Sequence, residues 1–279
     1  SGEYAASGIP LSTQSEWGWH SFPNSEGYRI EDTLVDFDTY GRPVPYPFDQ
    51  HSPAGQWLRG NPHRIGLGRL AFVFEKKDGS AAKLEDIRSI EQTLDMWTGV
   101  LRSRFSIDGE EISVETVCHP NKDLVSVSVT SKLAAESRLA VELSFAQGRS
   151  TWGIVPEDWD SPATHHSRIA QRSPTRIQIK RTLHSTTYQV DVAKPAGADF
   201  AETEPHRFRL SPGGSRTFEF SVRFSPDGRL DAPVPSFTET RDDARDAWRR
   251  YWESGGAIDL SQSSDPRARE LERRIVLSQ

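Results

Sequence analysis

A regular alternation of apolar and polar residues runs through the middle of the chain, from Ile65 to Phe224, and it constrains the fold more than any other feature. Alternation with a period of two is typical of strands that have one buried and one exposed face. Polar turns separate the alternating runs, whose apolar series begin at residues 70, 101, 112, 125, 139, 177, 188 and 218. We expect at least nine short strands in this part of the chain.

The character of these strands predicts a mainly β fold. Each run has one apolar face with Ser, Arg or Glu opposite it, which fits stacked antiparallel sheets better than a parallel α/β sheet buried on both faces. Asp108-Gly109 lies between two runs and is the strongest short hairpin signal. The sequence therefore predicts a large antiparallel two-sheet β-sandwich of the supersandwich type.

The ends of the chain break this pattern and suggest three parts. Residues 1–63 are rich in Trp, Pro, Gly and Asn without a sustained period, so we expect an irregular segment packed on a sandwich of residues 64–232. Residues 233–279 read as linker helices, the first with Ser236 and Glu239 as a capping box. Inside the sandwich, residues 147–174 predict a long loop.

A second helix is expected at the C-terminus. Asp265 is a good N-cap and Pro266 fits the first helical position. No Gly, Asn or Pro stops this helix before Gln279. We therefore expect the chain to be the front part of a longer polypeptide.

Composition excludes several classes of function. The formal net charge of -6 argues against a nucleic-acid binder, and no stretch approaches the ~20 apolar residues of a membrane span. A single cysteine, Cys118, rules out an intrachain disulfide or a Cys-based zinc cluster. The adjacent His165 and His166 cannot both face one metal from a regular strand. We predict neither a metal site nor a cofactor.

Two aromatic runs near the N-terminus, residues 17–24 and 57–64, indicate carbohydrate binding. Indole faces suit the C–H surface of a pyranose, while amide, imidazole and guanidinium groups bond hydroxyls. The alternative is that these tryptophans pin an irregular segment onto the sandwich, since Trp is generally well buried. The candidate substrate-binding residues are Trp17, Trp19, His20, Trp57, Arg59, Asn61 and His63.

A third cluster lies between Trp152 and Asp160. Glu157, Asp158 and Asp160 cluster with Trp159, and two carboxylates near an aromatic wall resemble a glycosidase acid/base pair. Carboxyl groups so close in sequence rarely face each other across a bond. We therefore favour a solvated loop here and predict no catalytic residue.

The chain also resembles a known family. The run from Asn61 to Arg69 leads to Gln92-Thr-Leu-Asp-Met-Trp-Thr-Gly99 and then to strands that end at His119-Pro120. This order resembles the N-terminal β-supersandwich of glycoside hydrolases and phosphorylases with an (α/α)6, or six-hairpin, catalytic barrel. Residues 269–279 look like the first barrel helix. The resemblance spans about residues 16–145 and 240–279.

The resemblance implies a function for the chain within a larger enzyme. In this family the catalytic acid and base lie in the barrel, so no catalytic residue can be carried onto this sequence. The expected partners are an oligosaccharide or glycoside substrate and a C-terminal (α/α)6 catalytic domain of the same polypeptide. We expect a domain that supports the barrel and shapes the sugar pocket, in an inverting glycoside hydrolase acting on an α-linked sugar.

Three alternatives stay open. A glycoside phosphorylase would replace water by phosphate. A self-standing carbohydrate-binding sandwich would use Trp17, Trp19 and Trp57 without catalysis, and a purely structural domain would bury them. The polar composition and the tryptophans favour a secreted or periplasmic setting, but the compartment stays open.

Overall fold

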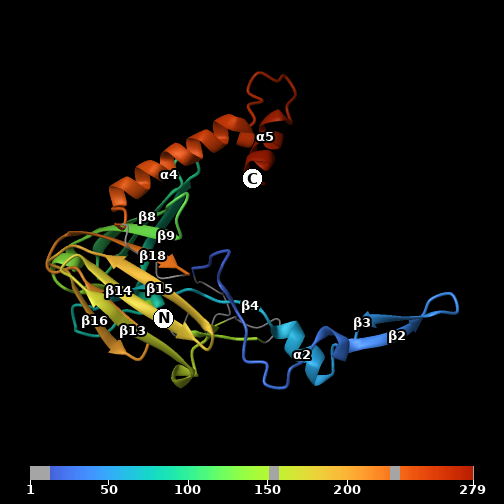
Figure 1. Cartoon of the computed structure of the whole chain (residues 1–279). Helices are drawn as coiled ribbons and strands as arrows, with labels where there is room; N and C mark the ends of the chain where they lie inside the picture. The colour runs from blue at the N-terminus through green and yellow to red at the C-terminus, as the bar shows by residue number, and fades with distance from the viewer. Residues whose placement is uncertain (1–12, 151–156, 227–232, 279) are drawn as a thin grey trace.

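Two antiparallel sheets form the body of the molecule. In this computed structural model, residues 13–150, 157–226 and 233–278 are described. The larger sheet has eight strands in the order β13-β14-β15-β18-β9-β8-β7-β6, and the smaller has four in the order β16-β17-β10-β5. Figure 1 shows the sheets with the helices α4 and α5 on one side and a long N-terminal extension on another. The predicted mainly β sandwich is confirmed.

Eight of the twelve strands of the two sheets coincide with the alternating runs of the sequence, whereas β6, β13, β16 and β17 do not. The larger sheet consists of β6 (Arg88–Asp95), β7 (Val100–Ile107), β8 (Glu110–Cys118), β9 (Leu124–Ser131), β13 (His165–Arg172), β14 (Arg176–Leu183), β15 (Thr186–Ala193) and β18 (Thr217–Ser225). The smaller sheet consists of β5 (Arg69–Phe74), β10 (Leu139–Ser144), β16 (Asp199–Glu204) and β17 (Arg207–Ser211). The predicted Asp108-Gly109 turn joins β7 to β8, and both residues have positive φ angles.

The facing sides of the two sheets bury one apolar core. Val129 of β9 and Phe218 of β18 on the larger sheet lie in the same cluster as Leu143 of β10 and Phe208 of β17 on the smaller one. All four side chains are fully or almost fully buried. Burial of this apolar surface is the main force that holds the sheets together.

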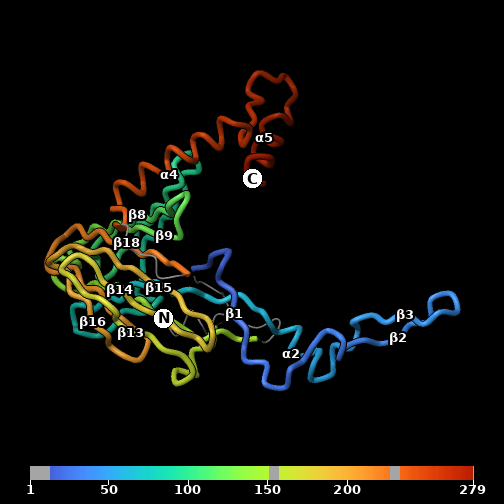
Figure 2. Tube along the Cα trace, in the orientation of Figure 1, coloured from blue at the N-terminus to red at the C-terminus, as the bar shows by residue number. Residues whose placement is uncertain are grey.

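The N-terminal segment contains short elements that lie partly outside the sandwich. β1 (Trp19–His20) pairs with β4 (His63–Arg64), and α2 (Pro53–Gly60) begins at the Ser52 N-cap. Between them lie η1 (Ile30–Thr33) and the hairpin of β2 (Leu34–Asp38) and β3 (Pro43–Pro47). Figures 1 and 2 show this hairpin extending away from the sheets.

Helix α4 (Phe237–Tyr251) packs on the outer face of the larger sheet. Its capping box of Ser236 and Glu239 forms as predicted. Phe237 and Ala244 bury against Val117 of β8. At the far end η4 (Trp252–Gly256) follows, and the Trp252 indole Nε1 donates to the Met96 carbonyl at 2.6 Å. The helix is therefore attached to the sheet at both of its ends.

Two local predictions were wrong. Helix α5 (Ala268–Leu277) begins after the expected Asp265 cap, because the Asp265 carboxylate accepts from the Arg267 backbone N–H at 2.8 Å and closes a turn before the helix. The region 147–174 is not one loop. It contains β11 (Gln147–Gly148), β12 (Glu157–Asp158), η3 (Pro162–Thr164) and the edge strand β13, whose mostly polar residues hide the strand pattern.

Short elements complete the described chain: η2 (Leu84–Asp86) and α3 (Lys132–Ala135). None of the helices in the described ranges is long and apolar enough to cross a membrane.

Candidate functional site

Four rings from distant parts of the chain meet beside β1. His20, Phe22, His63 and His184 form a group that we call the histidine cluster. His20 and His63 face each other across the β1–β4 pair, with ring centroids 5.3 Å apart. His184, in the turn between β14 and β15, stacks on His20 at 5.4 Å, and Phe22 stacks on His63 at 5.3 Å. The cluster thus joins the N-terminal segment to a turn of the larger sheet.

Burial favours neutral imidazoles at His20 and His63. His20 is 1% exposed, and its Nδ1 lies 2.9 Å from the Thr186 hydroxyl. Burial, with His63 and His184 nearby, lowers the pKa of His20 to about 4. The His63 Nδ1 donates to the Gly60 carbonyl at 3.0 Å, while burial lowers the pKa of His63. Both rings are therefore neutral near pH 7.

Asn61 connects this cluster to α2. Its side-chain oxygen accepts from the Phe22 backbone N–H at 2.8 Å, and its amide nitrogen donates to the Trp57 carbonyl at 3.0 Å. Trp57 is half-buried on α2, and Arg59 on the same helix is exposed and donates to the Gln50 side chain at 3.3 Å. The structure therefore brings His20, Asn61 and His63 together, with Trp57 adjoining them through Asn61.

The two tryptophans of the first aromatic run have different surroundings. Trp17 packs against the sandwich core, and its indole N–H donates to the Asp123 carboxylate at 2.7 Å. Trp19 is 45% exposed, with the Arg64 guanidinium 4.2 Å from its ring centroid. Of these two tryptophans, Trp19 is the one with an exposed indole that could stack on a sugar.

The acidic cluster that we expected to be a solvated loop is only partly so. Asp160 is exposed, but Glu157 is 4% exposed, so that expectation was wrong for this residue. The reason is the short β11–β12 ladder, which pairs Glu157 with Gly148 and draws Glu157 into the protein. Trp159 packs beside it with the Arg69 guanidinium 4.3 Å from its ring. Trp152 lies outside the described residues.

Several residues of this region were not among the predicted site residues, although Phe22 and Arg69 lie in runs that the sequence analysis singled out. His184 and Phe22 complete the histidine cluster, and Arg69 lies beside the acidic cluster. No local pattern marks His184 as a neighbour of His20, because 164 residues separate them. Finding His184 would have required a prediction of the turn between β14 and β15 and of its contact with the N-terminal segment.

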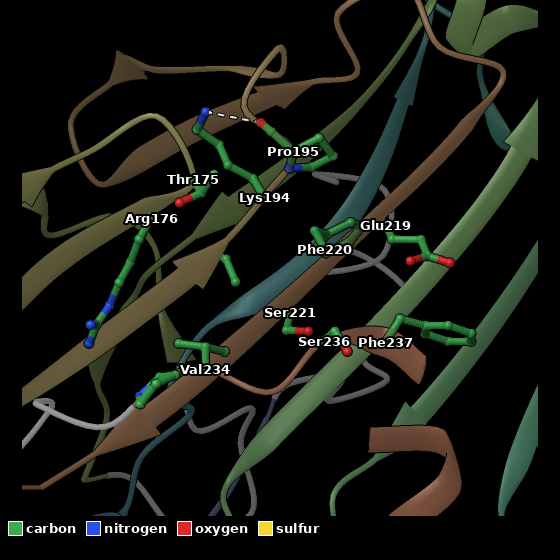
Figure 3. Close-up of a pocket in the computed structure, with 12 residues that line it drawn as sticks. Thr175, Arg176, Lys194, Pro195, Glu219, Phe220, Ser221, Val234, Ser236 and Phe237 are labelled. Atoms are coloured by element: carbon green, nitrogen blue, oxygen red, sulfur yellow. Dashed lines mark hydrogen bonds between the residues drawn. The ribbon is translucent and has the colours of Figure 1, made fainter. Parts of the chain in front are cut away.

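Other cavities lie away from these residues. One of about 510 Å³ lies where Thr175 and Lys194 approach the segment from Pro233 to Phe237 (Figure 3). Its Lys194 ammonium donates to the backbone carbonyls of Pro174 and Ala198, at 2.7 and 2.6 Å. That cation stabilises a loop. A second cavity of about 590 Å³ lies between the two sheets and has a mainly apolar lining.

The described ranges offer little for metal chemistry. Among residues 13–150, 157–226 and 233–278, no group of three or more His, Cys, Asp or Glu side chains is placed to hold a metal ion. His165 is buried and accepts from the Arg181 guanidinium at 2.9 Å, whereas His166 is exposed on the other face of β13.

Comparisons with known proteins give structural neighbours only. No protein-family model and no curated protein sequence matches the chain. A structure described as a kojibiose phosphorylase from the human microbiome is similar with a TM-score of 0.45 and 9% identity, over 88% of this chain and 39% of that one. A bacterial glucoamylase in complex with acarbose is similar with a TM-score of 0.45 and 6% identity, over 68% and 32%. The chain thus spans less than two fifths of either neighbour.

Proposed function

We propose that this chain is the N-terminal β-sandwich domain of a carbohydrate-active enzyme, an inverting glycoside hydrolase that acts on an α-linked sugar. In such an enzyme one carboxylic acid protonates the leaving oxygen while a carboxylate activates water across the sugar ring. We assign both groups to an (α/α)6 barrel that follows this domain. The domain itself supports the barrel and shapes the sugar pocket.

The observation that carries the proposal is the position of the run from Asn61 to Arg69, one of the segments on which the family resemblance rests. This run forms β4 and the start of β5. Asn61 and His63 lie in it, in contact with Phe22, Trp57 and the histidine cluster. The resemblance and the candidate sugar-binding residues therefore coincide in space.

The chemistry of the surrounding side chains fits this role. Trp19 presents an indole face with the Arg64 guanidinium on one side, and Arg59 is an exposed residue of α2 that donates to the Gln50 side chain. Flat apolar rings beside guanidinium and amide donors are suited to a polyhydroxylated ring. Their exposure supports contact with a substrate held between this domain and a second one.

Kinetics of the full-length polypeptide test this function. We expect it to hydrolyse α-linked disaccharides, with Trp19→Ala and Arg59→Ala each raising KM several-fold while the melting temperature changes little. Trp97→Ala is the matched control, because Trp97 is a tryptophan exposed by 55% in the turn between β6 and β7 and is not one of the candidate substrate-binding residues. If cleavage requires phosphate, the enzyme is a glycoside phosphorylase and not a hydrolase. No action on any saccharide, or unchanged KM in both variants, would contradict the proposal.

A further inference from the structure

The hairpin of β2 and β3 has no core of its own. None of the residues of these two strands is buried, and Figures 1 and 2 show the hairpin extending away from the sheets. Its base is held where the Thr33 carbonyl accepts from the backbone N–H groups of Phe48 and Asp49, at 3.0 and 3.1 Å. An isolated two-stranded hairpin is marginally stable in water. We call β2, β3 and the turn between them the hairpin arm.

One face of the hairpin arm is apolar and aromatic. Because side chains alternate between the two faces of a strand, Val35, Phe37, Val44 and Tyr46 lie on the same face. The Phe37 ring packs edge-on against Tyr46, with centroids 6.0 Å apart, and against Phe48, at 5.1 Å. These three rings are nevertheless exposed. A contiguous exposed apolar face of this kind is typical of an interaction surface.

The hydrogen-bond register decides which backbone groups of the arm point outward. Thr39 and Arg42 exchange two backbone hydrogen bonds, at 2.8 and 3.3 Å, on either side of the turn. Bonded and non-bonded pairs alternate along an antiparallel ladder. The non-bonded pairs, whose backbone groups point away from the opposite strand, are Asp38–Pro43, Asp36–Pro45 and Leu34–Pro47.

The two edges of the arm differ as a result. The outward positions of β3 are the prolines at residues 43, 45 and 47, and proline has no N–H to donate. At the edge of β2, the backbone N–H and C=O groups of Asp36 point outward. In the part of the chain that is described, β3 is the only strand paired with β2. The β2 edge is therefore open to an added strand, whereas prolines close the β3 edge.

Charge selects the kind of strand that fits this edge. Asp36 and Asp38 are exposed and lie on the face opposite Phe37. A second copy of β2, paired about a twofold axis at Asp36, would place this carboxylate opposite its own copy, and like charges in opposite positions are destabilising. A shift of two residues would place Asp36 opposite Asp38. Lys or Arg in those positions would instead be attracted.

We propose that the β2 edge binds an extended protein segment in which basic and apolar residues alternate. The basic side chains of this segment lie beside Asp36 and Asp38, and its apolar side chains continue the aromatic face beside Val35 and Phe37. Backbone hydrogen bonds to Asp36 contribute affinity, and the alternation of side chains contributes specificity. This surface contains none of the candidate sugar-binding residues and is independent of the proposed enzyme function.

Fluorescence anisotropy of a labelled peptide tests this surface on the 279-residue chain. The probe is a peptide of about seven residues, the length of an ordinary strand, in which Lys alternates with Val. We expect saturable binding that weakens as the salt concentration rises. A peptide with Glu in place of each Lys should bind at least about tenfold more weakly, because its charges face Asp36 and Asp38.

Substitutions at one ladder position separate the backbone contribution from the charge. Asp36→Ala removes the carboxylate and keeps the N–H, whereas Asp36→Pro removes both. We expect the Lys peptide to bind about threefold more weakly to Asp36→Ala and at least about tenfold more weakly to Asp36→Pro. Pro45→Ala is the matched control, because it changes the opposite edge of the same residue pair, and it should bind the peptide at least as tightly as the unmodified chain.

A charge exchange keeps the test decisive if proline disturbs the arm. Asp36→Lys retains the backbone N–H, and it should weaken binding of the Lys peptide while it strengthens binding of the Glu peptide. Thermal unfolding checks that each variant is folded. The melting temperatures should stay close to that of the unmodified chain, because the arm lies outside the apolar core.

Three results would overturn the proposal. These are the absence of saturable binding of the Lys peptide, equal binding of this peptide to Asp36→Pro and the unmodified chain, and no exchange of peptide preference in Asp36→Lys. Sedimentation velocity without peptide tests the second copy as the occupant. A dimer that Asp36→Pro dissociates, in a chain that binds no peptide, would assign the β2 edge to self-association instead.

Discussion

The Nε2 of His20 lies 3.3 Å from the Nδ1 of His184, although 164 residues separate the two in the sequence. The contact holds the N-terminal segment against the β14–β15 turn, and the two rings stack with an interplanar angle of 14°. Because His20 is buried and its ring is neutral, the contact should depend on pH.

Acidification should destabilise the fold between about pH 6.5 and 4. The pKa of His20 is about 4 in the folded chain, below the value of 6.5 in the unfolded chain. The unfolded chain therefore takes up a proton first, and the free energy of unfolding falls as pH decreases through this range. A difference of this size corresponds to about 3 kcal/mol. Urea unfolding at several pH values measures it.

The variant His20→Gln should flatten that pH dependence. The exposed His51, changed to Gln, is the control and should leave the pH profile unchanged. His165, whose pKa burial and Arg181 lower to about 3, should preserve a smaller slope in the His20 variant. An identical slope in His20→Gln and the unmodified chain would count against this account.

Gly148→Ala should destabilise the contact between β4 and β11. The new Cβ would lie 2.6 Å from the His63 Nε2 and 2.9 Å from the Ile65 side chain, so we expect a loss of about 1–3 kcal/mol. A double-mutant cycle with His63→Ala should recover part of this loss. Gly197→Ala, with open space around its Cβ, is the control. Strictly additive losses would refute the predicted clash.

Arg181 should be essential for folding. It is fully buried, and its guanidinium donates to His165, to the Ser167 hydroxyl and to the Ala146 carbonyl, the last at 3.0 Å. Arg181→Met leaves these acceptors unpaired, and we expect a loss of about 3–5 kcal/mol by chemical denaturation. Arg168→Met, exposed on β13, should cost little. Comparable losses in both variants would contradict a specific role for Arg181.

Substitution of Trp17 should mainly lower the stability of the fold, whereas substitution of Trp19 should mainly weaken sugar binding. Trp17→Ala removes a ring that packs against the core and donates to Asp123, so it should lower stability by about 3 kcal/mol. Trp19→Ala should cost much less stability, because its indole is 45% exposed, and should instead weaken sugar binding. Melting curves and sugar titrations separate the effects. A larger stability loss in Trp19→Ala would reverse the assignment.

The strands of the sandwich were predictable because their signal is local. In β9, Val125, Val127 and Val129 face the core while Ser126 lies on the face covered by α4, as their alternation indicates. Edge strand β13 escaped prediction, since neither face is continuously apolar. Period-two patterning identifies strands with one buried face and misses strands whose sides are both polar.

The candidate site was predictable only in part. Asn61 and His63 belong to one short run, and β1–β4 pairing adds His20. His184 and the pairing of Glu157 with Gly148 depend on long-range topology, which periodicity does not encode. Trp17 and Trp19 share one motif, yet only the folded chain distinguishes the ring packed on the core from the exposed one.

The attachment of α4 has a mechanical consequence. Trp252 is hydrogen-bonded to Met96, and the Trp248 indole lies so close to Gly99 that a Cβ there would be 2.1 Å from its Nε1. Since Met96 and Gly99 form the turn between β6 and β7, the direction of the helix axis is set by that turn. Larger side chains at Gly99 should push the Trp248 ring away and tilt α4, changing the position of α5, which follows α4 along the chain.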